Sequence, residues 1–167
     1  MIETRYLITA DIDDLYSWRI DPDVQESSLD DDIPTKDEHV LWFNIRDVEA
    51  SYMVQVNSNK IGTFSFKEEQ PNRKLVWSFH LNPKYKGQSF DGKRYSMILC
   101  EEALRVGFED KNANKIVGQV LSNNIKSVKL HKRLGFQQEG YFKQEVYKNE
   151  RFIDLYQFAI LKEDYNK

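Results

Sequence analysis

The chain has 167 residues, of which 40% are hydrophobic and 13% aromatic, which excludes a disordered protein and predicts one domain over residues 1–167. Its net charge of −3 excludes a global basic field that recruits nucleic acid. One cysteine, Cys100, excludes an internal disulfide, and no apolar run approaches the ~20 residues of a membrane span. The opening MIETRYLITADIDD has acids where a signal peptide has its apolar core, so a cytoplasmic protein with neither a nucleic-acid nor a membrane partner is expected.

The first segment predicts a strand followed by a short helix. Residues 2–8 (IETRYLI) form the expected strand, and Asp11 or Asp13 is expected to cap the helix. Asp21 ends this helix, because the residue before a proline disfavours helical backbone angles.

An acidic stretch, residues 21–32, follows the first helix. A solvated loop is the simpler interpretation of such a charge run. The alternative is an acidic lip that attracts a cationic amine substrate. After it, Thr35 with Glu38 three residues later is a capping box, which predicts the start of a second helix.

The middle of the chain alternates apolar and polar residues, as antiparallel strands do. Residues 52–56 and 61–66 predict a hairpin, and the polar segment 67–74 with Pro71-Asn72 predicts the next turn. Residues 75–81 (LVWSFHL) form a third strand. The sequence therefore predicts an antiparallel meander.

The second half predicts helices alternating with strands. The expected elements are a helix over 93–110, a strand over 116–121, a helix over 124–134 and a closing hairpin of 137–143 with 152–161. A meander followed by strand–helix–strand–helix implies an α/β (α+β) protein. Its central sheet would be mixed and mostly antiparallel, with helices on both faces.

The helix over 124–134 carries polar side chains beside its apolar face. At ~100° per residue, Asn124, Ser127 and His131 fall within ~60° of one another, next to Leu130 and Leu134. A helix that only filled a core would not need this polar edge. These residues are therefore candidate functional groups.

This segment resembles the C-terminal half of a GCN5-related N-acetyltransferase (GNAT). The resemblance rests on N-x-x-S, an aromatic residue or His four positions after the Ser, and then K-x-L-G-F and E-G. The matching residues are Asn124, Ser127, His131, Lys132, Leu134, Gly135, Phe136, Glu139 and Gly140. The resemblance implies an acetyl-CoA-dependent transfer of acetyl to a primary amine, and pairing of exposed strands in that family implies a homodimer by analogy.

A loop that feeds a helix start presents free N–H groups and a positive dipole end to an anion. In the family this place holds the coenzyme A diphosphate in R/Q-x-x-G-x-G/A. In this chain the glycine positions of that pattern align near Gly92, Arg94 and Ser96, so only part of the pattern is present. A longer loop, YKGQSFDGKRYS, takes its place. The resemblance implies that acetyl-CoA contacts Leu81, Lys86, Gly87, Gly92, Lys93, Arg94, Tyr95, Ser96, Asn124 and Ser127.

Acyl transfer needs an amine that has lost its proton, an N–H donor for the oxyanion and a proton for the leaving thiolate. The family places that N–H near Leu81 and its general acid, often a Tyr, at the position of His131. His80 is the candidate base, with Glu68, Glu69 or a water chain as alternatives. Because the three histidines are widely scattered, no metal site is expected.

Two branches of the family share further residues with the chain. Trp18-Arg19, Asp21-Pro22-Asp23-Val24 and His39-x-x-Trp42 are similar to amino-sugar acetyltransferases such as the pseudaminic acid pathway enzyme. That similarity implies a UDP-linked amino sugar bordered by Arg19, His39 and Trp42. Residues around Lys148 resemble the ribosomal-protein branch instead, so a ribosomal-protein or polyamine acetyltransferase stays open. A non-catalytic acyl-coenzyme A or nucleotide-sugar binding module is the alternative of another class.

Overall fold

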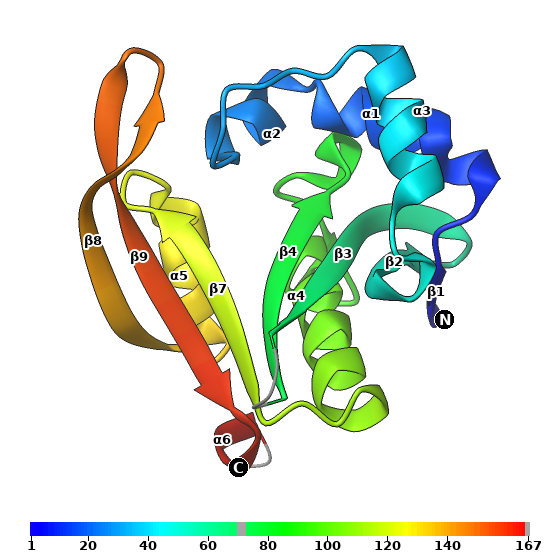
Figure 1. The fold of residues 1–167 in the computed structure, drawn as a ribbon. Coiled ribbons are helices and arrows are strands. Elements are labelled where there is room, and N and C mark those ends of the chain that lie inside the picture. The colour runs from blue at the N-terminus through cyan, green and yellow to red at the C-terminus, as the bar shows by residue number, and fades with distance from the viewer. Residues whose placement is uncertain (70–72, 166–167) are drawn as a thin grey trace.

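The structure is a computed structural model that describes residues 1–69 and 73–165. Within these residues a seven-stranded sheet has the order β1-β2-β3-β4-β7-β9-β8 (Figure 1). Neighbouring strands are antiparallel except β4 and β7, which run parallel. The strands are β1 (Ile2–Tyr6), β2 (Ser51–Val56), β3 (Asn59–Glu69), β4 (Lys74–Leu81), β7 (Lys115–Leu121), β8 (Gln137–Lys148) and β9 (Arg151–Leu161). The predicted mixed, mostly antiparallel sheet is confirmed.

Most helices lie before the meander or between the later strands, and a short one follows the last strand (Figure 1). They are α1 (Ile12–Arg19), α2 (Pro22–Ser27), α3 (Lys36–Ile45), α4 (Tyr95–Arg105), α5 (Ile125–Arg133) and α6 (Lys162–Tyr165). A π-helical turn, Val106–Asp110, extends α4. A small hairpin of β5 (Ser89–Phe90) and β6 (Lys93–Arg94) precedes α4, so the helix expected from residue 93 begins two residues later.

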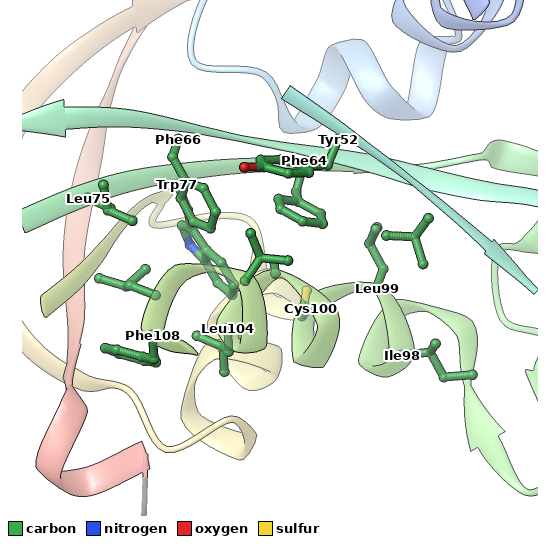
Figure 2. Close-up of a cluster of buried hydrophobic side chains, with 14 of the residues drawn as sticks. Tyr52, Phe64, Phe66, Leu75, Trp77, Ile98, Leu99, Cys100, Leu104 and Phe108 are labelled. Carbon is green, nitrogen blue, oxygen red and sulfur yellow. The ribbon is translucent and has the colours of Figure 1, made fainter. Parts of the chain in front are cut away.

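Helices cover both faces of the sheet, as the sequence predicts. Alternate residues of a strand point to opposite faces, and β2 shows this directly. Tyr52 and Val54 belong to the large core that α4 closes (Figure 2). Met53 belongs instead to a smaller cluster with Leu15 of α1 and Phe43 of α3.

The capping box predicted for α3 is present. The Thr35 hydroxyl accepts a hydrogen bond from the Glu38 N–H at 3.3 Å, and the Glu38 carboxylate accepts one from the Thr35 N–H at 2.7 Å. Both bonds satisfy amide groups that the first helical turn leaves free. The cap therefore fixes where α3 begins.

The cap predicted for α1 differs from the structure. Asp11 occupies the N-cap position, but its side chain makes no capping bond to α1. Its carboxylate accepts hydrogen bonds from the Ile8 N–H at 2.9 Å and from the Arg5 guanidinium at 2.7 Å, and it pairs with Lys60 at 2.9 Å. Two cations outcompete the helix N–H groups, since charged hydrogen bonds are stronger.

The solvated loop predicted over residues 21–32 is corrected by the structure, which has α2 at its start. Asp21 caps this helix by accepting the Asp23 N–H at 2.9 Å, and Pro22 stands at the first helical position. Proline fits that position, because its missing N–H has no helical partner there. The Asp21-Pro22 pair thus ends α1 and also starts α2.

The hairpins differ from the predictions mainly in length. β3 continues to Glu69 and β4 begins at Lys74, which shortens the turn predicted over 67–74; its Pro71-Asn72 lies outside the described residues. β8 continues to Lys148, past the predicted end at residue 143. No helix in the described part of the chain is long and apolar enough to cross a membrane.

Candidate functional site

The two parallel strands diverge at the centre of the sheet (Figure 1). β4 and β7 pair only from Lys74↔Lys115 to Val76↔Val117, so the carboxyl-end half of β4 has no partner on that side. The Asn82 N–H donates to the Ile61 carbonyl at 2.8 Å, which makes Leu81 and Gly62 a non-hydrogen-bonded pair. The N–H of Leu81 therefore points away from β3, toward the diverging β7.

A cavity of about 220 Å³ lies on the α1 and α3 side of the sheet. Its floor is formed by hydroxyl-bearing residues of the strands and by His80, and its walls come from the two helices. The lining residues are Leu7, Leu15, Trp18, Arg19, His39, Trp42, Ser51, Thr63, Phe64, Ser65, Ser78 and His80. The three residues predicted to bind the acceptor, Arg19, His39 and Trp42, therefore line one cavity together with the candidate base His80.

The cavity carries a positive charge and no carboxylate among its lining residues. Arg19 is half-buried, and its guanidinium has no ion-pair or hydrogen-bond partner among the residues the structure describes. The side chain of His80 is exposed on the cavity side and has protein closely around it elsewhere. This desolvation and, secondarily, the Arg19 charge lower the pKa of His80. The imidazole of His80 is therefore neutral near pH 7.

His39 holds its place through contacts on several sides. The side chain is 2% exposed, and Nε2 lies 3.2 Å from the Ile12 carbonyl of α1, to which it donates. Its ring lies between those of Tyr16 and Trp42, with centroids 5.4 and 5.3 Å away. Desolvation above all lowers its pKa. His39 thus joins α3 to α1 as a neutral wall of the cavity.

The predicted general acid, His131, lies in the core rather than in this cavity. Its side chain is 2% exposed and lies against Trp77, Phe136 and Phe158. Nδ1 donates to the Ser127 carbonyl at 2.8 Å, and Nε2 accepts the Trp77 indole N–H at 3.1 Å. Both ring nitrogens are occupied, and desolvation lowers the pKa. This geometry argues against the general-acid role, since Nε2 carries no proton to give.

We expect His131→Gln to lower the free energy of unfolding by about 1–2 kcal/mol and to leave kcat unchanged. The amide oxygen of Gln can still accept the Trp77 N–H, while the bond to the Ser127 carbonyl is lost. Because the folded-state pKa is lowered, wild-type stability should fall as the pH drops below about 6.5, and less so in the variant. Urea unfolding across pH measures this. A kcat loss of about 10²-fold would restore the acid role.

The predicted coenzyme A loop forms the β5–β6 hairpin ahead of α4. Asp91 and Gly92, with φ of 49° and 76°, make its turn, and such positive φ angles suit a two-residue hairpin. α4 begins after Arg94 without a side-chain cap and without an acid in its first turn. The Tyr95 N–H donates to the Gln88 carbonyl at 3.1 Å, whereas no side chain in the described part of the chain caps the N–H groups of Ser96 and Met97, which are open to an anion. Arg94 is exposed with no partner among the described side chains.

Other predicted cofactor contacts already have partners. Lys86 pairs with Asp23 of α2, and Lys93 pairs with Glu101 at 2.7 Å. All four of these side chains are partly exposed, so their pairs are weak and exchangeable. The Tyr95 ring lies tilted against that of Tyr85, with 4.8 Å between the ring centroids. Gly87 lies in the same loop with a φ of 73°, and Ser96 lies in the first turn of α4.

The polar edge predicted on α5 has mainly local contacts. Asn124 caps the helix by accepting the Ser127 N–H at 3.2 Å. The Ser127 hydroxyl lies 3.4 Å from Nδ1 of His131. These bonds leave the predicted contact of both residues with the cofactor as a prediction.

Sequence reasoning missed the hydroxyl floor of the cavity. Thr63 and Ser65 on β3 pair with His80 and Ser78 on β4, and Ser51 of β2 lies beside them. Polar residues at alternate positions of two paired strands share one face. That spacing was the available signal. In the described residues, no three His, Cys, Asp or Glu side chains gather into a metal-binding cluster.

Comparison with known sequences identifies relatives of the chain. A family model described as an acetyltransferase (GNAT) domain matches residues 3–137. YnaD of Bacillus subtilis, an uncharacterized N-acetyltransferase, is 32% identical over 92 residues, which are 55% of this chain and 50% of that protein. The spermidine N(1)-acetyltransferase of Vibrio cholerae is 27% identical over 138 residues, 74% of this chain and 80% of that protein. The chain thus spans about half the length of YnaD.

Solved structures share the fold. The spermidine N-acetyltransferase from Vibrio cholerae, in complex with CoA and spermine, superposes with a TM-score of 0.86 at 23% identity, over 99% of this chain and 98% of that one. A GNAT-family acetyltransferase from Bacillus anthracis gives 0.81 at 20% identity, over 97% and 95%. At these identities the likeness concerns the fold. The family model spans most of the sequence, and the chain therefore belongs to the GNAT acetyltransferase family.

Proposed function

We propose that the chain transfers acetyl from acetyl-CoA to the primary amine of an amino sugar that carries an anion, with a nucleotide-linked amino sugar as the expected acceptor. The composition of the cavity carries this proposal. Trp18 and Trp42 offer faces on which a sugar ring stacks. The hydroxyl floor and the neutral histidines suit sugar hydroxyls, and the unpaired Arg19 suits a phosphate.

Acetyl-CoA would supply the activated acyl group, and this chain's residues would hold it on the other side of the sheet. The uncapped start of α4 and the exposed Arg94 suit its diphosphate. The unpaired edge of β4 suits its amide-bearing arm, and the Leu81 N–H suits the oxyanion that forms when the amine attacks. His80, the residue before Leu81, points into the acceptor cavity and would take the proton from the amine.

A polyamine acceptor is the second candidate, because a relative is named a spermidine acetyltransferase. A polycation is held by carboxylates, and the cavity lining has none. The carboxylates of the acidic segment lie outside that lining; Asp23, for example, pairs with Lys86. The cavity therefore favours an anion-bearing amine over a polycation.

The test is release of free coenzyme A thiol from acetyl-CoA with three acceptor classes: UDP-linked amino sugars, spermidine and spermine, and peptides with free N-termini. We expect turnover with the first class. Turnover restricted to polyamines or to peptides would overturn the acceptor assignment. Tight binding of acetyl-CoA with no turnover of any amine would overturn the enzyme assignment in favour of a binding module.

We expect Arg19→Ala to raise the KM for a UDP-linked amino sugar by about tenfold or more, since a hydrogen bond to a charged group contributes roughly 1.5–3 kcal/mol. The KM for acetyl-CoA should stay unchanged, because its site lies across the sheet. Arg133→Ala, an exposed arginine at the end of α5, is the matched control. An unchanged acceptor KM in Arg19→Ala would contradict the anion-binding role.

A further inference from the structure

Lys148, at the end of β8, is a buried lysine whose contacts lie far away in the sequence. Its side chain is 3% exposed, and Nζ donates to the backbone carbonyls of Gln25, Glu26 and Ser28, at 3.2 Å for Glu26 and 2.6 Å for Ser28. No carboxylate lies within ion-pair distance among the described residues. Its three N–H donors thus match three carbonyls at the C-terminal end of α2.

These contacts anchor a helix that has little else to hold it. α2 is six residues long and contains no buried residue. The pair of Asp23 with Lys86 at its start is partly exposed and contributes little. A cation at the carboxyl end of a helix interacts favourably with the helix dipole. Beside it, the Asn149 N–H donates to Asp31 at 2.9 Å. The hairpin of β8 and β9 therefore sets the position of α2.

The position of α2 in turn affects Arg19, which lines the acceptor cavity. The side-chain amide of Gln25 donates to the Arg19 carbonyl at 2.6 Å, at the last residue of α1. Only Ile20 and Asp21 separate α1 from α2. Trp18 has its own anchor in the small apolar cluster. The guanidinium of Arg19 has no such anchor among the described residues, so the position of the end of α1 determines where this guanidinium lies.

We propose that Lys148 is a positioning residue for acceptor binding, which acts through α2 and Gln25 to hold Arg19 at the cavity. This inference rests on the proposed function, because it takes Arg19 as the group that binds the anion of the acceptor. Lys148 itself touches neither acceptor nor cofactor. Its effect should accordingly fall mainly on acceptor binding, because α2 meets the predicted acetyl-CoA loop through the exposed, weak pair of Asp23 and Lys86.

The test uses UDP as the probe, because it has a diphosphate and no amine, with coenzyme A saturating so that the cofactor site is closed to it. We expect Lys148→Met to weaken UDP binding, measured by calorimetry, by about tenfold. Lys143→Met is the matched control, since Lys143 is an exposed lysine of the same strand. In the Arg19→Ala background, Lys148→Met should add nothing, because coupled residues are non-additive.

Several outcomes would overturn the inference. These are unchanged UDP affinity in Lys148→Met, equal weakening in the Arg19→Ala background, and no UDP binding to the wild type. Gln25→Met, which removes only the amide bond to Arg19, guards against a folding defect and should weaken UDP binding in the same direction. A lower urea midpoint with unchanged UDP affinity would make Lys148 purely structural.

The proposed function and this inference fail in different assays. No coenzyme A release with any amine, combined with the expected UDP results, would remove the function and keep Lys148 as a positioning residue. Turnover of a UDP-linked amino sugar with an acceptor KM indifferent to Lys148→Met would keep the function and remove the inference.

Discussion

Replacing His80 with glutamine is expected to lower kcat by about 10²-fold or more, the usual contribution of a general base. Among the described residues of the cavity floor, His80 is the one titratable side chain, and it directly precedes Leu81, whose N–H faces the divergence of β4 and β7. Because its pKa is lowered, the imidazole of His80 is neutral near pH 7 and can accept a proton. Glutamine keeps the size and polarity of the side chain but cannot accept a proton.

The dependence of kcat on pH shows which protonation state of His80 is active. A base acts in its neutral form, so the kcat of the wild type should be flat near pH 7 and fall only below the usual His pKa of about 6.5. His80→Gln should lose this acidic limb along with the activity. Ser78→Ala, on the same strand and in the same cavity, should retain it. A full acidic limb in His80→Gln would assign the base to another group or to water.

Local signals in the sequence predict most of the secondary structure. The capping box at Thr35, the alternation in the meander and the helix after Asn124 all depend on neighbours within a few positions. The acidic segment shows the limit of that approach. Charge alone predicts a loop there, whereas the Asp21-Pro22 start and the distant Lys148 stabilise α2.

The sequence predicts only part of the candidate site, because spacing along the chain does not show which distant side chains meet. Family resemblance brought Arg19, His39 and Trp42 together, and the structure places them on one cavity with His80. Helical spacing put His131 on a polar edge, yet its partner Trp77 is 54 positions away on β4. Spacing describes which residues share a face, but tertiary packing decides whether that face meets solvent or aromatic rings.

The largest expected effect on stability belongs to Asp11. We expect Asp11→Ala to lower the free energy of unfolding by about 3 kcal/mol or more, because removing one partner of a buried ionic cluster leaves the others uncompensated. Its carboxylate is fully buried, while its partners Arg5 and Lys60 are partly exposed. The cluster ties β1, α1 and β3 together. The midpoint of urea unfolding measures the loss.

The acid dependence of stability tests the same cluster. Hydrogen bonds from Arg5, the Ile8 N–H and Lys60 outweigh desolvation and lower the pKa of Asp11 to about 2. A carboxylate with a depressed pKa adds stability above its unfolded pKa and loses that contribution as the pH falls toward the folded value. Wild-type stability should thus fall between about pH 4 and pH 2, more steeply than that of Asp11→Ala. Asp13→Ala is the control: the Asp13 side chain is 89% exposed and pairs with Lys36, so this variant should match the wild type at both ends of the range. Equal acid slopes in wild type and Asp11→Ala would mean that the ionisation of Asp11 contributes nothing to stability in this pH range.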